Sequence, residues 1–364
     1  MEKMERKRSR RASLSAEQRR KLSMLRSASI PSPLTPKYVV STDRSGDIHV
    51  HVQGDLSQQD KRCVFLTVHD LGTNHSTMVD FVNSPAMSEI KERSCFIHVD
   101  VPGHEEGSPD LPDSYQFPSL QTLGEDLITV LDFLHVRYAV GLGEGAGANV
   151  LARCGLAHPR RLLGLILVNC TASTSSVADA FRSRFSRWRG ADISQSEEDF
   201  LIYHKFGHQI SSDSCEAGER DRMLTEYRSR LRGNLNTHNI KQYVRAFINR
   251  KDLVLRGCQP DILLITGMLS PYSTVIEKMY KELDKERVTI LKVDRAGDVL
   301  AETPAKIAQS LLLFCQGQGL LTSLPPPGVE RRMSRAMSME EYDKPNIRRL
   351  SLTPAQPDSP HRKL

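Results

Sequence analysis

The chain has 364 residues, of which 39% are hydrophobic and 26% charged, a composition typical of a globular core with polar extensions. It contains no run of about 18 apolar residues, and its basic first thirty residues lack an apolar stretch, so we expect neither a membrane span nor a secretory signal. Seven cysteines without a CxxC pair or a His/Cys ligand cluster predict reduced thiols, a cytoplasmic protein, no metal site and no cofactor.

The net charge of +6 is distributed unevenly along the chain. Residues 1–37 contain 11 Lys/Arg against 3 Asp/Glu, and residues 319–364 contain 8 against 5. The remainder, residues 38–318, contains 31 basic and 36 acidic residues. Because a nucleic-acid-binding domain is expected to carry a basic patch on its folded core, we expect no specific nucleic-acid partner.

Composition and pattern divide the chain into one domain at residues 38–318 and two Arg/Ser-rich tails, residues 1–37 and 319–364, which are predicted to be disordered. The domain opens with a predicted hairpin of Tyr38–Ser41 and Asp47–Gln53. Further apolar runs predict strands, in chain order, at Val64–His69, Cys95–Val101, Ala139–Gly143, Leu163–Asn169, Asp261–Thr266 and Val288–Val293.

Helical periodicity lies between most of these strands. Leu120–Leu134 has one apolar face, and Pro304–Gln316 closes the domain with proline in its first turn. Such alternation predicts an α/β fold with a mostly parallel sheet covered by helices on both faces. Between Cys170 and Arg256 the sequence has charged helical stretches and no good strand, which predicts a helical cap at about residues 173–256.

Three turns resemble those of the α/β-hydrolase superfamily. His69-Asp70-Leu71-Gly72 stands where a His-Gly turn supplies an oxyanion-hole amide, and Asp100-Val101-Pro102-Gly103-His104 matches the turn after the fourth strand. Gly143-Glu144-Gly145-Ala146-Gly147 has the spacing of the G-x-S-x-G nucleophile elbow. The resemblance implies an α/β-hydrolase fold.

The same resemblance places the three catalytic positions. Gly145 stands at the nucleophile, Ser270 at the acid and Asp298 at the histidine, each within a preserved frame. Glycine has no side chain and cannot be a nucleophile. We therefore predict a degenerate triad, no enzymatic activity, and a vestigial pocket that comprises His69, Gly72, His104, Glu144 and Ala146.

Two features could support other chemistry at the opening of this vestigial pocket. His69, His75 and His104 are expected to gather near the former active-site opening. They would act there either as remnants that bind a small ligand or form a displaced acid/base pair or, as we favour, as inherited turn geometry and hydrogen bonding. Ser76 is a weak candidate for a relocated nucleophile, because no strained turn or acid partner accompanies it.

The resemblance then narrows to the N-myc downstream-regulated family. Its characteristic segments look like Val68–Asn74, His98–Gly107, Tyr115–Leu120, Gly141–Ala148 and His158-Pro159 here. Membership implies a hydrolase-like fold without known hydrolase activity, roles in growth control, differentiation and stress signalling, and phosphorylation of a tail. The leading hypothesis is a non-enzymatic signalling or adaptor protein with protein partners. The alternatives are an unconventional hydrolase with displaced catalytic groups and a membrane-associated protein that uses a basic tail.

The tails carry the regulatory pattern. Arginine precedes serine by three residues at six candidate phosphorylation sites, a spacing that basophilic kinases recognise: Ser13, Ser23, Ser29, Ser334, Ser338 and Ser351. The basic tail could also follow an anionic membrane surface, which would make the protein peripheral at membranes. In the cap, Phe181, Phe185 and Trp188 share a helical stripe that suits either such a surface or, as we favour, packing over the vacant pocket.

Overall fold

The computed structural model describes residues 35–173, 195–207, 217–233 and 235–325, and the compact unit that contains the domain begins at Lys37. Two sets of sequence predictions fall outside the described residues. These are the six candidate phosphorylation serines and the aromatic stripe of the cap, namely Ser13, Ser23, Ser29, Ser334, Ser338, Ser351, Phe181, Phe185 and Trp188.

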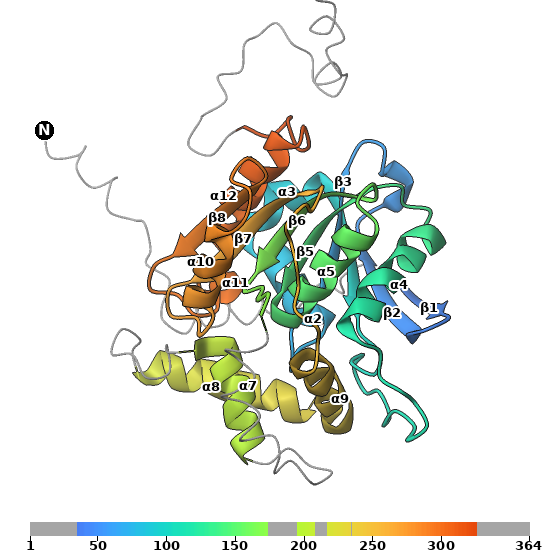
Figure 1. Ribbon diagram of the computed structural model, residues 1–364, viewed down its shortest axis with the longest axis vertical. Coiled ribbons are helices and arrows are strands. Elements are labelled where there is room, and N and C mark those ends of the chain that lie inside the picture. Colours follow the sequence, from blue (N-terminus) through green and yellow to red (C-terminus); the bar gives the residue numbers. More distant parts are fainter. Residues whose placement is uncertain (1–34, 174–194, 208–216, 234, 326–364) are drawn as a thin grey trace, which may run out of the picture. The chain divides into compact units, whose positions relative to one another are not determined.

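An eight-stranded sheet forms the centre of the domain, with strand order β1-β2-β4-β3-β5-β6-β7-β8 (Figure 1). β2 runs antiparallel to both β1 and β4, and every other neighbouring pair is parallel. The predicted hairpin and the six predicted strands are confirmed. Their bounds are β1 Lys37–Thr42, β2 Gly46–Gln53, β3 Cys63–Val68, β4 Ser94–Asp100, β5 Ala139–Glu144, β6 Leu162–Val168, β7 Asp261–Gly267 and β8 Val288–Val293.

The central strands read as continuous apolar runs because both of their faces are covered. In β3 every residue is buried, and Phe65 and Leu66 belong to the two separate hydrophobic clusters on opposite faces of the sheet. The turn before β2 is fixed by Ser45, whose hydroxyl donates to Asp126 Oδ2 at 2.7 Å, and by Gly46, whose φ is 72°. This turn anchors the hairpin edge of the sheet to the helix that carries Asp126.

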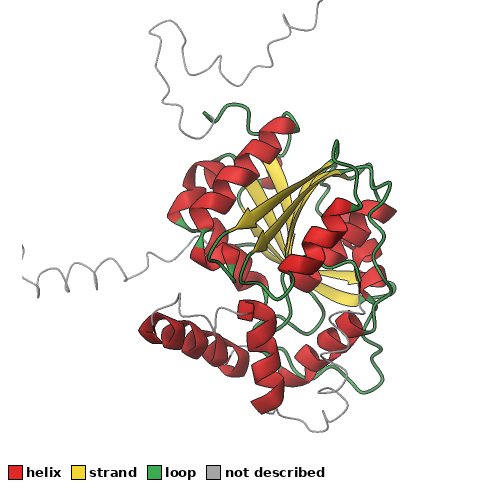
Figure 2. Ribbon diagram, turned by 60° about the vertical axis from the view of Figure 1, so that its left-hand side comes forward, coloured by secondary structure: helices red, strands yellow, loops and turns green. Residues whose placement is uncertain are grey.

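Helices cover both faces of the sheet (Figure 2). Helices α4 (Leu120–Phe133), α5 (Gly145–Ala157) and α10 (Ser273–Lys281) contribute to one hydrophobic cluster. The opposite cluster receives α2 (His75–Val82), α3 (Ser88–Glu92), α11 (Val299–Glu302) and α12 (Pro304–Gly317), together with the 3-10 turn η3 (Pro85–Met87). A second 3-10 turn, η2 (Leu56–Gln58), precedes β3. The predicted α/β layers are thus confirmed.

Between β6 and β7 the described residues form three helices, α7 (Gln195–Phe206), α8 (Ala217–Gly233) and α9 (Thr237–Ile248), and no strand. They lie at one end of the sheet, beyond the carboxyl ends of the parallel strands (Figure 1). Asn239 of α9 ties this layer to the turn after β4, since its side chain donates to Gly103 O at 3.0 Å and accepts from Leu111 N at 2.9 Å. Ligands of open α/β sheets bind at this edge, so the cap stands over the place where a site is expected.

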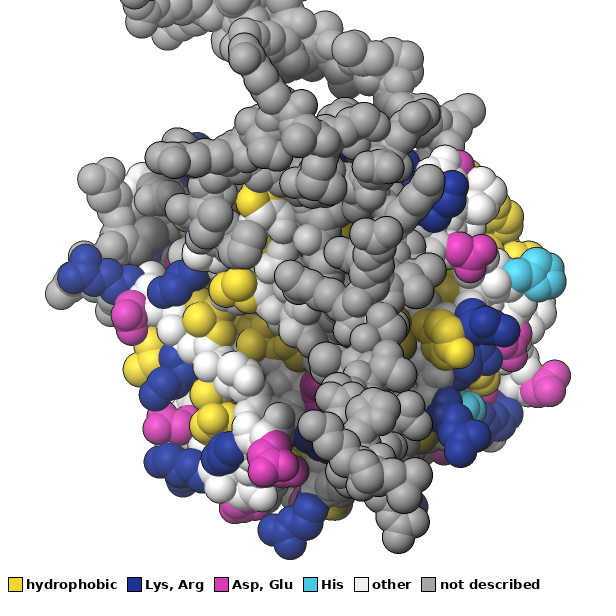
Figure 3. Space-filling model, turned by 90° about the horizontal axis from the view of Figure 1, so that it is seen from above, with side chains coloured by type: hydrophobic (Ala, Val, Ile, Leu, Met, Phe, Trp, Pro, Cys, Tyr) yellow, Lys and Arg dark blue, Asp and Glu magenta, His cyan; other side chains and the backbone are white. Residues whose placement is uncertain are grey.

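Two surface observations bear on partners. Within the described ranges no helix is both long and apolar enough to cross a membrane. Figure 3 looks onto the end of the domain away from the cap, and its visible described surface shows basic and acidic side chains interspersed with apolar ones.

Candidate functional site

The elbow has the strand–turn–helix geometry that the sequence predicts. β5 ends at Glu144 and α5 begins at Gly145, whose φ of 51° lies in the left-handed region that favours glycine. A Cβ at Gly147 would overlap the backbone carbonyls of Val68 and His69, so α5 approaches β3 closely only with glycine there. The backbone of a nucleophile elbow is therefore retained without a nucleophile.

Asp70 occupies the space that the elbow leaves open. A Cβ at Gly145 would overlap the Asp70 carboxylate. The backbone N–H of Ala146 donates to Asp70 Oδ1 at 2.8 Å. In a hydrolase elbow, the amide after the nucleophile faces the developing oxyanion. Here an internal carboxylate takes both the position of the missing side chain and this amide.

The cap holds Asp70 in place. His204 Nε2, from the last turn of α7, lies 3.0 Å and 2.9 Å from the two carboxylate oxygens of Asp70. The other ring nitrogen of His204 hydrogen-bonds the hydroxyl of Tyr272, and all three side chains are buried. Burial alone would raise the pKa of Asp70, but His204 and Lys205 outweigh it and lower that pKa to about 2. Asp70 is therefore an ionised, fully bonded group.

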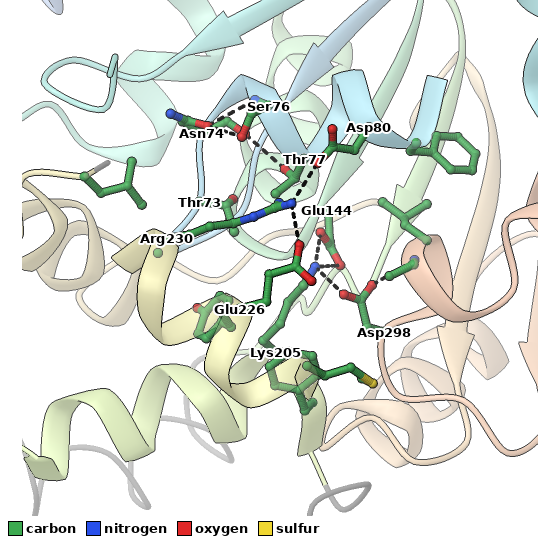
Figure 4. A pocket seen from close by; sticks show the side chains of 18 residues that line it. Thr73, Asn74, Ser76, Thr77, Asp80, Glu144, Lys205, Glu226, Arg230 and Asp298 are labelled. Carbon is green, nitrogen blue, oxygen red and sulfur yellow. Dashed lines mark hydrogen bonds and ion pairs between the residues drawn. The ribbon is translucent and has the colours of Figure 1, made fainter. Parts of the chain in front are cut away.

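Next to the hydrogen-bonded side chains of Asp70, His204 and Tyr272 lies a cluster of two carboxylates and one ammonium group. Lys205 Nζ is 2.7 Å from both carboxylate oxygens of Glu144 and 3.2 Å from Asp298 Oδ2 (Figure 4). Burial, with Asp298 and Asp70 nearby, raises the pKa of Glu144 to about 7. The same carboxylates raise the pKa of Lys205 against the opposing effect of burial. The predicted histidine position of the triad thus holds a carboxylate that pairs with a lysine from the cap.

Ser270, which stands at the acid position of the triad, makes hydrogen bonds that shape the turn after β7. Ser270 lies buried in the turn after β7, where its N–H donates to Gly267 O at 3.0 Å. Its hydroxyl oxygen accepts from Tyr272 N at 3.3 Å. The structure thus places Gly145, Ser270 and Asp298 after the ends of three strands, β5, β7 and β8, and gives each a contact that does not belong to a hydrolytic triad.

A cavity of about 360 Å³ lies beside the cluster, between the start of α2, the loop after β8 and α8 (Figure 4). Part of its polar wall is paired internally, since Arg230 Nη2 lies 3.0 Å from Asp80 and 2.8 Å from Glu226, whereas the buried hydroxyl of Tyr227 has no hydrogen bond within the described structure. Apolar side chains from the core and the cap complete it, including Phe81, Phe206 and Leu300. The cavity is large enough for a small ligand or for the side chains of a docking peptide.

The structure divides the residues of the predicted vestigial pocket into two groups. Gly72 and Glu144 line the cavity, but His69, His104 and Ala146 are buried and do not. Tyr243 of α9 packs against the His69 and His104 rings, with centroids 5.8 Å and 5.3 Å away, and the amide of Ala146 is bonded to Asp70. His69 is bonded through both ring nitrogens, to Asp70 O and from Val101 N.

The expected gathering of three histidines is met only in part. The rings of His69 and His104 lie 5.3 Å apart, whereas His75 turns to Asp100. Ser76 lines the cavity, and its hydroxyl donates to Asn74 Oδ1 at 2.7 Å. That contact fixes the first turn of α2 and offers Ser76 no general base.

Sequence reasoning missed the residues that close the site. Asp70 was assigned only to a turn, and His204, Lys205 and Tyr272 were not singled out. The available signal was weak: a His-Lys pair ends a helical stretch just before Gly207, and both side chains are buried. A lysine is rarely buried without a charged partner, so a buried His-Lys pair would indicate a site. The sequence alone does not show that these two side chains face the core.

Comparisons with known proteins identify relatives of this chain. The chain is 38% identical over 328 residues to uncharacterized protein ZK1073.1 of Caenorhabditis elegans, covering 88% of this chain and 96% of that protein. It is 32% identical to protein NDRG1-A of Xenopus laevis, with 82% and 75% covered, and 30% identical to protein NDRG3 of the same species, with 80% and 78% covered.

Solved structures share the fold at low identity. A hydrolase from Pseudomonas aeruginosa has a TM-score of 0.57 at 19% identity, with 76% of this chain and 97% of that chain covered. A carboxylesterase from Nitrososphaera gargenis has a TM-score of 0.59 at 15% identity, with 78% and 99% covered. The family profile described as the Ndr family matches residues 38–322. The chain has an α/β-hydrolase fold and belongs to the Ndr family.

Proposed function

We propose that this protein is a non-catalytic member of its fold and acts by binding, as a signalling or adaptor protein. The observation that carries the proposal is the position of Asp70, which fills the nucleophile space at Gly145 and accepts the hydrogen bond of the Ala146 amide. Stabilisation of an oxyanion requires a free, preorganised donor at that place. A carboxylate there repels a developing negative charge as well as blocking access to the donor.

The cap reinforces the same conclusion. Lys205 pairs with both Glu144 and Asp298, so the carboxylate at the triad histidine position is engaged in an ion pair. The cavity persists beside this cluster, bounded by α8 and the start of α2. A closed catalytic centre beside a persistent cavity supports recognition of a partner rather than turnover of a substrate.

Regulation forms the finer part of the proposal. The family resemblance implies growth, differentiation or stress signalling in the cytoplasm. The six Arg-x-x-Ser sequences of the tails would place that signalling under basophilic kinases. Each phosphate adds about −1.5 to −2 charges and several strong acceptors, which is sufficient to create or abolish a docking site.

A displaced hydrolase is the second candidate, because Asp70, His204 and Tyr272 form a hydrogen-bonded chain that resembles an acid–base relay. The geometry weighs against it. All three side chains are buried, and none of them lines the cavity described above. A substrate in that cavity would not reach the Tyr272 hydroxyl.

Activity assays test the non-catalytic proposal. The full chain should show no labelling by a serine-reactive fluorophosphonate probe and no turnover of activated esters above buffer. Gly145→Ser should remain inactive, because its side chain overlaps Asp70 and Asp298 stands at the triad histidine position. Gly145→Ser combined with Asp70→Gly is the matched variant that removes the overlap. Stoichiometric labelling of the native chain, or substantial turnover by Gly145→Ser alone, would contradict the proposal.

Partner capture tests the adaptor role. The full chain, phosphorylated by a basophilic kinase, is compared with a variant that has alanine at the six candidate serines, and the bound proteins are identified by mass spectrometry. We expect at least one partner whose recovery depends on phosphorylation. Identical partners for both forms would leave the tails without the proposed regulatory role.

A further inference from the structure

A separate polar cluster lies where β2 and β4 meet the first turn of α2. His75 Nδ1 is 2.7 Å from Asp100 Oδ2, and His51 Nε2 is 3.3 Å from the same oxygen. One donor atom from each of the three residues lies within 4.8 Å of the others. The cluster does not line the cavity beside Lys205, so it is independent of the function proposed above.

The backbone fixes this convergence. Across the antiparallel β2–β4 pair, His51 faces His98 and His49 faces Asp100, which makes His51 and Asp100 diagonal neighbours on one face. The N–H of His75 donates to Asp100 Oδ1 at 2.6 Å, which leaves Oδ2 turned toward the imidazoles. The His51 and His75 rings are stacked with centroids 3.6 Å apart and planes at 10°. Three elements thus deliver three side chains to one point.

Unsatisfied polar atoms gather at this point. His51 Nε2 is buried and, although it lies 3.3 Å from Asp100 Oδ2, it makes no contact with hydrogen-bond geometry within the described structure. His49 Nδ1 and Glu105 Oε2 close by also lack a hydrogen bond there. His98, by contrast, is bonded through both ring nitrogens. Because buried polar atoms are nearly always paired, an imidazole nitrogen without a hydrogen bond beside a buried carboxylate points to a ligand that both could hold.

We propose that His51, His75 and Asp100 form a binding site for a divalent transition-metal ion of the zinc class. Two imidazoles and one carboxylate match the ligand preference of zinc, whereas calcium and magnesium prefer oxygen alone. Around tetrahedral zinc, with bonds of about 2.0–2.1 Å, donor atoms lie about 3.3 Å apart. The His51–Asp100 Oδ2 separation of 3.3 Å matches that spacing. The His75–Asp100 Oδ2 separation of 2.7 Å is a hydrogen bond, which the ion would replace by moving the two atoms apart by about 0.6 Å.

The two histidines of this site lie close to the surface of the domain. The side chains of His51 and His75 are 13% and 17% exposed, while Asp100 is buried behind them. Three protein ligands leave a fourth position for water, as in open zinc sites. Asp100 is itself oriented by the His75 amide, a supporting contact of the kind that holds metal ligands in place. This inference departs from the sequence-based expectation of no metal site, since residues from three segments make up the ligand set.

Metal titration of the full-length, metal-stripped chain without a polyhistidine tag tests the proposal. Zn²⁺ binding is measured by calorimetry, and Co²⁺ is used as a visible probe of tetrahedral coordination. The test variants are His51→Gln and His75→Gln. His158→Gln is the matched control, because that histidine lies at the end of α5 and bonds the Glu125 carbonyl at 3.1 Å, apart from the cluster. Background binding by other histidines and thiols is common to all four proteins.

We expect the wild type and His158→Gln to bind one equivalent of Zn²⁺ more than either test variant. The Co²⁺ form should show intense visible bands that the test variants lose, and Zn²⁺ should raise the melting temperature only where the site is intact. Equal stoichiometry in the wild type and His51→Gln, with no change in the Co²⁺ spectrum, would overturn the proposal. His51→Gln is decisive even if His75→Gln fails to fold, because His51 lies on β2, outside α2.

Discussion

Replacing Lys205 with methionine tests the ion cluster that closes the former active site. The substitution keeps most of the side-chain volume and removes the only described cation that contacts both Glu144 and Asp298. Loss of one partner from a buried ion pair costs about 3–5 kcal/mol, because the remaining charge is buried without compensation. The repacking itself should cost less than about 1.5 kcal/mol. We therefore expect Lys205→Met to lower the free energy of unfolding by about 3–5 kcal/mol near pH 8.

The loss should depend on pH in a direction that the structure fixes. The pKa of Glu144 is raised from 4.5 to about 7 in the folded protein. A raised carboxyl pKa stabilises the fold at low pH, and this contribution is lost as the pH rises from about 4.5 to about 7. Without Lys205 the Glu144 pKa rises further, so the carboxyl is protonated near pH 5.5. At about pH 5.5 the loss of unfolding free energy in Lys205→Met should therefore be about half of the loss near pH 8, because only Asp298 then lacks its ion-pair partner.

Urea denaturation followed by circular dichroism at both pH values measures the effect. Glu144→Gln added to Lys205→Met removes one of the uncompensated charges and should recover part of the loss near pH 8. Lys281→Met is the control, since that exposed lysine pairs with Glu277 at 3.5 Å and should change stability by less than about 0.5 kcal/mol. Wild-type stability of Lys205→Met near pH 8, or a deficit identical at both pH values and untouched by Glu144→Gln, would refute the reasoning.

Two further predictions concern acid stability and the N-terminal tail. Burial lowers the pKa of His104 to about 3, so its contribution to stability is complete above about pH 6.5 and is lost as the pH falls toward 3. His104→Phe should therefore reduce the slope of unfolding free energy against pH in this range by up to about 1.4 kcal/mol per pH unit; an unchanged slope in urea titrations would mean that His104 is already charged in the fold. Phosphorylation of Ser13, Ser23 and Ser29 should reduce the net charge of residues 1–37 from +8 to about +2 to +3.5 and release the chain from anionic vesicles. Co-sedimentation at two salt concentrations checks this, and binding that ignores salt, phosphorylation and deletion of residues 1–37 would rule it out.

Local patterns were sufficient to predict most of the fold. β3 and the helix that begins at Leu120 follow from apolar runs and periodicity within a few residues, and the elbow follows from glycine spacing alone. The contacts that close the site join residues far apart in the sequence, so local patterns do not predict them. Asp70 meets Ala146 across 76 residues of sequence and His204 across 134. Nothing in the neighbourhood of either residue specifies such a partner, because it depends on how the cap folds back over the sheet.

The proposed metal site of His51, His75 and Asp100 could not be predicted from the sequence for a related reason. His51 and Asp100 become neighbours only through the β2–β4 register, and His75 joins them because α2 starts beside that pair. None of these spacings resembles a short metal-binding motif. Only the pairing of strands reveals a ligand set of this kind.

The end of α7 has a consequence for how the domain opens. His204 and Lys205 are consecutive residues, yet one is bonded to Asp70 after β3 and the other to Glu144 at the end of β5 and to Asp298 after β8. If this helix moved away from the sheet, Asp70 would lose its bond to His204, and Glu144 and Asp298 would lose their ion pairs with Lys205, all at the same time. Amide hydrogen exchange in the last turn of α7 should therefore be as slow as in the central strands, so that this part of the cap and the sheet open as one cooperative unit.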